Sequence, residues 1–180
     1  MRIASFVTLL AVVTCLYGSS LPEEPTKVSV CQLKNDPAAF NHKRVEVTGF
    51  VSHGFENFTL FDETCSSSQS IWLEYGGKRN SNTVYCCGTV ANGKRKSVLE
   101  VENLAVPLVE DKVFREFDRI INRSSDSTLD ALRIHVTLIG RFFSGEQQKI
   151  GNTISLGGYG HLGCCSLLVI EQVTSVKVDH

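Results

Sequence analysis

The chain has 180 residues and nearly balanced charge, with 18 Lys and Arg against 19 Asp and Glu. Hydrophobic residues make up 42% of it, which is typical of a globular protein and excludes a disordered or fibrous one. The formal net charge of −1 argues against a protein held on nucleic acid by bulk positive charge. At this length we expect one domain.

The first twenty residues have the pattern of a secretory signal peptide. One basic residue, Arg2, precedes an apolar run over residues 3–16, and small residues occupy positions 18–20. The apolar run is shorter than the roughly 20 residues that a membrane-spanning helix needs. We therefore predict a signal peptide over residues 1–20, no membrane span, and a secreted or periplasmic location. A lipoprotein acylated at Cys15 is the alternative, but the residue before Cys15 is larger than such a site prefers.

Beyond the signal peptide, the chain begins with polar residues and two short turns. Residues 21–28 contain two prolines and are predicted to form a mobile leader, followed by a single domain over residues 29–180. Residues 29–35 predict one short helical turn. Asp36 is the expected N-cap of a second turn that begins at Pro37.

Alternating apolar residues and β-forming residues predict five strands. In chain order they cover residues 45–51, 58–62, 71–75, 134–142 and 167–178, the last with a change of face near Glu171. Between the third and fourth strands, apolar residues at helical spacing predict an amphipathic helix over residues 109–121. A cysteine-containing insertion follows the third strand at about residues 76–97, and a glycine-rich connection over residues 144–163 precedes the fifth.

This order of elements predicts a small, mainly β barrel. Two strands share an apolar-x-apolar-x-Gly pattern, which ends at Gly49 in the first strand and at Gly140 in the fourth. Alternating apolar residues fill a barrel interior, and glycine permits the tight coiling that a closed sheet needs. Five strands with one helix between the third and fourth resemble the OB-fold, a Greek-key barrel.

The resemblance narrows to small exported bacterial OB-fold proteins at three groups of residues. These are the opening Val30-Cys31-Gln32-Leu33 with Asp36-Pro37-Ala38-Ala39-Phe40 and Val45-Glu46-Val47-Thr48-Gly49, the strand segments Phe58-Thr59-Leu60-Phe61-Asp62 and Ile71-Trp72-Leu73, and the loop Gly158-Tyr159-Gly160-His161-Leu162-Gly163. The likeness covers most of residues 29–75 and 108–178. It implies export and an OB-fold-like barrel, and it names no ligand because these proteins are largely uncharacterised.

Candidate binding residues lie on the outer face of the second and third strands, where OB-fold barrels commonly hold ligands against aromatic side chains. Alternation places Phe61, Trp72 and Glu74 on this face. Phe61 and Trp72 could stack on a sugar, a base or a peptide side chain. The alternative is that the insertion or the N-terminal turns cover them, because uncovered large aromatic side chains are uncommon on a monomer.

The cysteines predict disulfides, because an even number remains once the signal peptide is removed from an exported chain. The remaining cysteines are Cys31, Cys65, Cys86, Cys87, Cys164 and Cys165. We expect one bridge between the Cys86-Cys87 pair and the Cys164-Cys165 pair, because linking two neighbours departs from the usual Cα separations. Cys31 and Cys65 are the next candidates for pairing.

The same cysteines leave a metal-binding or thiol-redox protein as the alternative. His161 lies just before Cys164 and Cys165, and with Cys86 and Cys87 this set offers sulfur and imidazole ligands for zinc or copper. The spacing matches no closed zinc signature, and an exported location favours oxidised cysteines over thiolate ligands.

The sequence contains no G-x-S-x-G, H-E-x-x-H or P-loop motif, so we expect no enzyme. The basic run at residues 94–96 is expected to be a solvated loop and not a phosphate-binding patch. We therefore expect an exported, non-enzymatic OB-fold binding module that serves the cell envelope or stress tolerance, with no cofactor. Its ligand would be a peptide, a glycan or another envelope component, and nucleic acid is not expected.

The predicted cleavage site can be checked on exported protein. N-terminal sequencing of the mature chain should begin at Leu21, because the small residues at 18–20 meet the cleavage requirement. Recovery of an intact 1–20 segment, or of a lipid on Cys15, would contradict this prediction.

Overall fold

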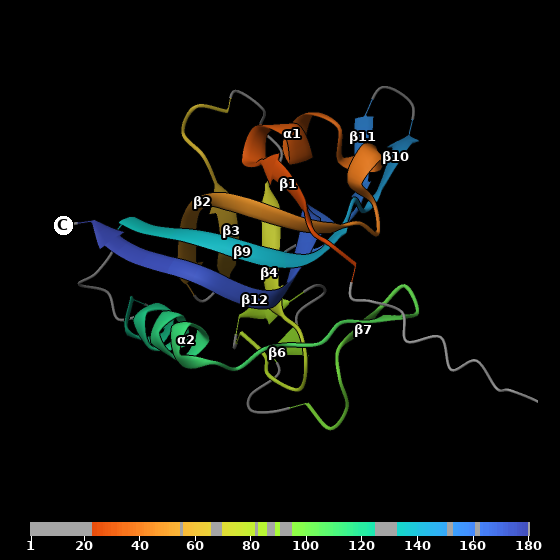
Figure 1. Cartoon of the computed structure of the whole chain (residues 1–180). Helices are drawn as coiled ribbons and strands as arrows, with labels where there is room; N and C mark the ends of the chain where they lie inside the picture. The colour runs from red at the N-terminus through yellow and green to blue at the C-terminus, as the bar shows by residue number, and fades with distance from the viewer. Residues whose placement is uncertain are drawn as a thin grey trace, which may run out of the picture.

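The computed structural model describes residues 23–54, 56–65, 70–81, 83–85, 89–90, 95–124, 133–150, 153–160 and 163–179. Five strands close into a barrel in the order β2-β3-β4-β12-β9, because β2 pairs with β9 as well as with β3. They are β2 (Arg44–Gly54), β3 (Asn57–Phe61), β4 (Ile71–Tyr75), β9 (Arg133–Phe143) and β12 (Ser166–Asp179). β4 and β12 run parallel, and the other neighbours in the barrel run antiparallel. The predicted mainly β, OB-fold-like barrel is confirmed (Figure 1).

The apolar side chains that alternate along the strands fill the barrel interior. Val47 and Val136 are 1% and 0% exposed and belong to one core, as their shared pattern predicts. The glycines that end the two patterns lie where strands approach closely. A Cβ at Gly49 would lie 2.9 Å from a carbonyl oxygen of β3, and a Cβ at Gly140 would overlap the backbone of Val169. Neither position has room for a side chain.

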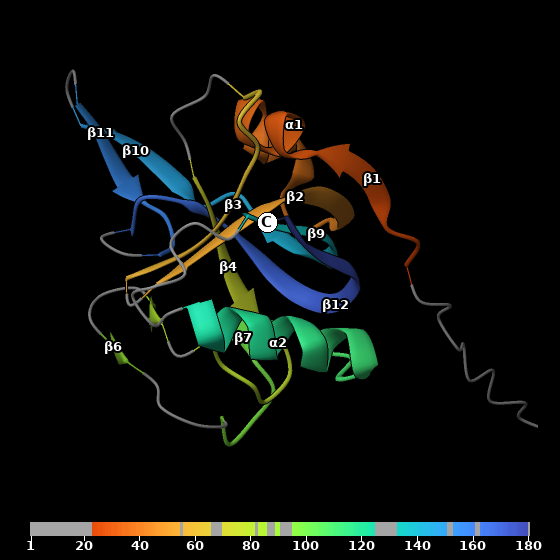
Figure 2. The same cartoon turned by 90° about the vertical axis from the view of Figure 1, so that its left-hand side faces the viewer.

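Helix α2 (Lys112–Ser124) packs across one end of the barrel, below it in Figures 1 and 2. Phe114 and Phe117 are fully buried in the barrel core, as predicted. The helix begins later than predicted, because the Asp111 side chain accepts a hydrogen bond from the Phe114 backbone and caps it there. Val109 therefore precedes the helix, and it is 47% exposed. No helix among the described residues is long and apolar enough to cross a membrane.

Part of the segment predicted to be a mobile leader is a strand. β1 (Thr26–Ser29) pairs in parallel with β2, so backbone hydrogen bonds hold the end of the 21–28 segment against the barrel. Glu23, three residues earlier, accepts a hydrogen bond of 2.6 Å from Arg141 of β9. The prolines that suggested mobility lie before this strand and therefore do not interrupt its hydrogen bonds.

Two short turns follow β1 and carry the caps that the sequence predicts. Helix α1 (Val30–Asn35) begins with a capping box, in which Ser29 and Gln32 each hydrogen-bond the backbone of the other. The 3-10 helix η1 (Pro37–Phe40) has a proline in its first turn, and the Asp36 side chain accepts a backbone hydrogen bond there. Both turns lie on the side of the barrel opposite α2 (Figure 1).

Three small hairpins add to the barrel. They are β5 (Val84–Tyr85) with β6 (Thr89–Val90), β7 (Glu100–Val101) with β8 (Leu104–Ala105), and β10 (Glu146–Ile150) with β11 (Thr153–Gly157). The β10–β11 hairpin occupies much of the predicted irregular connection and projects from the barrel (Figure 2). Its two strands pair only with each other among the described residues. A hairpin apart from the core needs no alternation of buried apolar residues, so the sequence pattern gave no signal of it.

The first of two disulfides among the described residues joins Cys31 of α1 to Cys65, just beyond β3, with Cα atoms 5.2 Å apart. This pairing is the one that the sequence suggested. It closes a loop with a sequence separation of 34. For a loop of this length the chain-entropy model gives about 4 kcal/mol of stabilisation.

The second disulfide joins Cys164 to its neighbour Cys165, so the predicted bridge from this pair to Cys86-Cys87 is wrong. The expectation assumed an extended chain, in which neighbouring side chains point to opposite sides. Here the two sulfurs are bonded, so the side chains of Cys164 and Cys165 lie on the same side of the chain. Cys86 and Cys87 lie outside the described residues.

Shortening one interior side chain tests the barrel register. Val47→Ala should lower the free energy of unfolding by about 2 kcal/mol, because it removes two buried methyl groups and leaves a cavity. Denaturant unfolding measures the change, and Val109→Ala, the same substitution at a 47% exposed side chain, should leave stability almost unchanged. If Val47→Ala is as stable as the wild type, Val47 does not face the core.

Candidate functional site

Three ring side chains lie in a row across three strands on the outside of the barrel. Phe61 of β3 lies opposite Phe50 of β2, and Phe50 lies opposite His135 of β9. The ring centroids are 5.8 Å apart for Phe61 and Phe50, and 5.0 Å apart for Phe50 and His135. Cross-strand ring neighbours stabilise each other. We call Phe61, Phe50 and His135 the ring row.

The ring row faces outward because of the strand alternation. The next residue on each strand, Val51, Leu60 or Ile134, is buried in the barrel core, so the side chains of the ring row point to the opposite face. Each of the three rings is partly exposed. The row therefore keeps an open aromatic surface.

Arg133 adds a positive charge over Phe50, the middle ring of the ring row. Its guanidinium carbon lies 4.5 Å from the centre of the Phe50 ring, within the range of a cation–π contact. Its Nη2 lies 3.0 Å from Oε1 of Glu63. Both charged side chains are half exposed or more, so their pairing adds little to stability and both remain able to contact a ligand.

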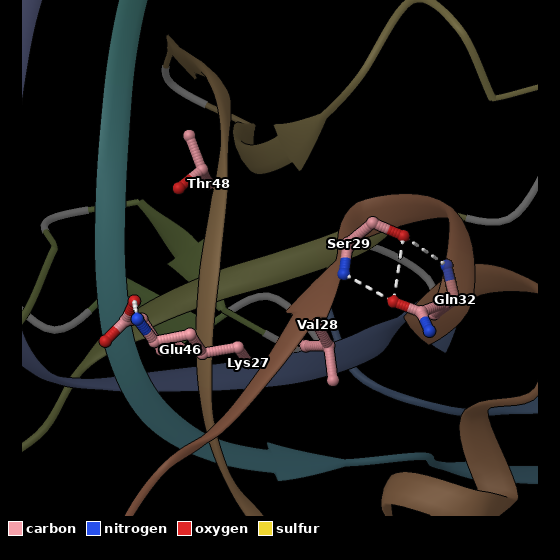
Figure 3. Close-up of a pocket in the computed structure, with 6 residues that line it drawn as sticks. All are labelled: Lys27, Val28, Ser29, Gln32, Glu46 and Thr48. Atoms are coloured by element: carbon pink, nitrogen blue, oxygen red, sulfur yellow. Dashed lines mark hydrogen bonds and ion pairs between the residues drawn. The ribbon is translucent and has the colours of Figure 1, made fainter.

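A hollow of about 370 Å³ opens on the same side of β2. It is lined by Lys27, Val28, Ser29, Gln32, Glu46 and Thr48. Figure 3 shows these side chains coming from β1, the first turn of α1, and β2. Nζ of Lys27 lies 3.6 Å from Oε1 of Glu46, and the capping box presents its hydroxyl and amide groups at the other wall. The hollow is open to solvent, and it offers hydrogen-bond donors and acceptors together with one positive and one negative side chain.

Thr48 connects the hollow with the ring row. Its hydroxyl oxygen lies 3.0 Å from that of Thr137, which is opposite it on β9. Thr48 and Phe50 are two residues apart on β2 and therefore share a face. The hollow and the ring row form one continuous surface, which we call the outer face.

Of the three residues predicted to bind a ligand, Phe61 belongs to the outer face and the other two are covered. Trp72 and Glu74 point away from the barrel interior, as alternation predicts, but each is 2% exposed. Trp72 lies in a second apolar cluster, where Val106 and Cys165 are among the residues that cover it. The stacking surface expected on β4 is therefore closed at Trp72. Its cover includes Leu99, Val106 and Cys165, and the cluster around it contains no described residue of the 76–97 insertion or of the N-terminal turns that were expected to cover it.

Glu74 fixes the insertion to the barrel. Its carboxylate accepts hydrogen bonds from the backbone N–H groups of Tyr75 (2.7 Å) and Ser81 (2.9 Å) and from the Ser81 hydroxyl (3.0 Å). Arg95 Nη2 lies 3.2 Å away. Burial raises the pKa of Glu74, against the opposing effect of Arg95 and the donors. Arg95, expected to lie in a solvated basic loop over residues 94–96, is instead turned inward to pair with this carboxylate.

A charge cluster lies where β12 changes face. The change predicted near Glu171 is confirmed, because the β12–β9 pairing shifts register there. Glu171 is 5% exposed and lies 2.6 Å from Nε of Arg44 and 3.7 Å from Nε of Arg141. Arg141 also donates to Glu23, and this hydrogen bond lowers the pKa of Glu23. Two arginines thus meet two glutamates, and the cluster carries no excess positive charge.

His42, Glu102 and Tyr159 meet at another point on the surface. His42 Nε2 lies 2.5 Å from one Glu102 oxygen, and the Tyr159 hydroxyl donates to the other. The hydrogen bond from Tyr159, and then that from His42, lower the pKa of Glu102. His42 and Glu102 have positive φ angles of 62° and 49°, which are uncommon for residues other than glycine.

The metal set suggested by the sequence is not assembled within the described residues. Cys164 and Cys165 are bonded to each other, and a disulfide sulfur is not the thiolate that binds a metal. Cys86, Cys87 and His161 lie outside the described residues.

A second possible ligand set fails for the same reason. Ligand atoms of Cys31, Asp62 and Cys65 lie within 4.8 Å of one another. Both sulfurs belong to the disulfide, which leaves Asp62 as one isolated carboxylate. This group carries no metal site in its oxidised form.

Sequence reasoning missed Phe50 and His135. Alternation along each strand was a sufficient signal that both point outward, since each lies between buried neighbours. Their contact depends on which residue of β2 lies opposite which residue of β9, and a single strand pattern does not contain this register.

Comparisons with known proteins found no relative: no family model, no curated protein and no solved structure matches this chain. The resemblance to small exported bacterial OB-fold proteins stays a prediction. The chemistry of the outer face is therefore the basis for a function.

His53 gives the barrel a pH dependence. Its ring lies edge-on to Phe58 with centroids 5.1 Å apart, and Nε2 is 3.4 Å from the carbonyl oxygen of Ser81. Burial lowers the pKa of His53 by more than the Ser81 carbonyl raises it. The unfolded chain therefore binds the proton at higher pH than the folded one. The free energy of unfolding should fall as the pH drops below about 6.5.

Removing the titrating ring tests this dependence. His53→Gln keeps an amide donor for the Ser81 carbonyl but does not titrate, so the loss of stability between about pH 6.5 and 5 should become shallower. Denaturant unfolding at a series of pH values measures it. An unchanged slope in His53→Gln would assign the pH dependence to other groups.

Proposed function

We propose that this protein is an exported, non-enzymatic binding module that holds its ligand on the outer face of β2, β3 and β9. The observation that carries the proposal is the ring row of Phe61, Phe50 and His135, which stays partly exposed beside a polar hollow. An aromatic surface beside convergent polar groups is the usual composition of a binding site. The barrel supplies rigid strands under both parts.

The chemistry of the outer face favours a glycan among the ligands that an envelope offers. Ring side chains pack against the apolar faces of sugar rings, and hydroxyl, amide and carboxylate groups hydrogen-bond to sugar hydroxyls. Lys27 is paired with Glu46, and Arg44 with Glu171. The face therefore lacks the excess positive charge that binding to a nucleic acid backbone requires.

Two observations support export. The signal-like segment over residues 1–20 is the first. The Cys31–Cys65 disulfide is the second, because such bridges persist in oxidising compartments outside the cytosol. Both agree with a role at the cell envelope.

Substitution in the ring row tests the binding site. The mature protein is first titrated by NMR with oligosaccharides, peptides and oligonucleotides, and the proposal expects shifts at the outer face with oligosaccharides. Phe50→Leu keeps apolar volume but removes the aromatic ring. It should weaken binding roughly five- to ten-fold, since an aromatic contact is worth about 1 kcal/mol beyond its buried area.

Leu104→Ala is the matched control, because this apolar side chain is 37% exposed and belongs to the β7–β8 hairpin, which is not part of the outer face. It should bind as the wild type does. Shifts confined to residues away from β2, β3 and β9, or equal affinity of Phe50→Leu and the wild type, would reject this face as the site.

A further inference from the structure

The two disulfides of the described chain differ in what they can contribute to stability. Cys31–Cys65 joins positions 34 residues apart, and the stabilisation that a bridge gives by restricting the unfolded chain grows with loop length. Cys164–Cys165 joins adjacent residues, so it restricts the unfolded chain very little. Loop closure therefore does not explain why Cys164 and Cys165 are bonded.

The adjacent pair lies on a backbone that is held in place. Tyr159 donates its N–H to the Cys165 carbonyl at 2.7 Å and accepts from the Cys165 N–H at 3.0 Å. Gly158 N–H donates to the Gly163 carbonyl at 3.1 Å, and a Cβ at Gly158 would lie 2.9 Å from that oxygen. The surrounding chain keeps the two cysteines together whether or not their sulfurs are bonded.

The two sulfurs differ in access. Cys165 is 4% exposed and lies in the cluster of Trp72, whereas Cys164 is only partly buried. Thiol–disulfide exchange needs one accessible sulfur for attack, and the other sulfur is then the leaving group. Adjacency also holds the Cα atoms 3.7 Å apart, below the usual range of about 4.4–6.8 Å, and departures from that range make a disulfide easier to reduce.

We propose that Cys164–Cys165 is a reversible redox site that exchanges with a dithiol partner. One thiolate of the dithiol attacks Sγ of Cys164, the bond between the two cysteine sulfurs breaks, and Sγ of Cys165 leaves and takes up a proton. The second thiol of the partner loses its proton and attacks the mixed disulfide, which releases Cys164 as a thiol and the partner as a disulfide. Two electrons pass from the dithiol to the pair, and the reverse sequence oxidises it again.

Reduction at this site changes the cover of Trp72. A Cβ at Gly160 would overlap the Trp72 indole, so Gly160 lies directly on the ring, while Cys165 packs in the same cluster. Once the sulfurs separate, the two cysteine side chains can take independent rotamers, and the contacts of Cys165 in this cluster change.

Trp72 is the chain's only tryptophan and therefore reports on the pair without a label. Mature protein is equilibrated in mixtures of reduced and oxidised dithiothreitol, its tryptophan emission is recorded, and thiols are alkylated and located by peptide mass mapping. We expect a reversible change in emission with a two-electron dependence on the dithiol ratio. Alkylation should appear at Cys164 and Cys165 at ratios where Cys31 and Cys65 remain bonded.

Two double variants complete the test. C164S/C165S should lose the transition, and C86S/C87S, which removes the other adjacent pair, should keep it. Mass mapping of the wild type gives an answer even if C164S/C165S fails to fold. The proposal is overturned if Cys31 and Cys65 are reduced first, if Cys164 and Cys165 become alkylated with no change in emission, or if C86S/C87S abolishes the transition.

Discussion

The double pairing of β2 is the constraint on which the rest of the structure depends. β2 (Arg44–Gly54) pairs with β9 along its first part and with β3 along its second, and β1 pairs in parallel beside the first part. A strand with partners on both edges closes the sheet and removes its free edges. Gly49 permits the close approach of β2 to β3, because a side chain at this position would collide with β3.

The outer surface of the closed barrel has two regions, which differ in whether other segments cover their outward side chains. On β4 every residue is buried, because one set of side chains fills the barrel while the other meets a second apolar cluster outside it. On β2, and at Arg133, His135 and Thr137 of β9, the outward side chains stay at least partly exposed. The covered region contains Trp72 and the adjacent cysteines, and the open region contains the ring row and the hollow. The proposed redox site and the proposed binding face therefore lie in separate regions.

The buried charged side chains of the described residues are paired. The buried carboxylate of Glu74 is compensated by Arg95 and three hydrogen-bond donors, since an isolated buried charge is strongly unfavourable. Glu171 meets Arg44 and Arg141 in the same way. These pairs hold loops and strand ends on the barrel. On the outer face the charged side chains are also paired, Lys27 with Glu46 and Arg133 with Glu63. This charge balance agrees with the proposed glycan ligand better than with a polyanion.

The sequence by itself determined the elements whose signals are local. Alternation defined the barrel strands, helical spacing placed Phe114 and Phe117 on the buried side of α2, and Asp36 marked a cap, because each signal depends on residues only a few positions apart. Tertiary structure alone decided the burial of Trp72, since its cover comes from distant segments. It also decided the ring row, which requires a strand register. These outcomes depend on which distant residues meet in space, and local periodicity carries no information about such pairings.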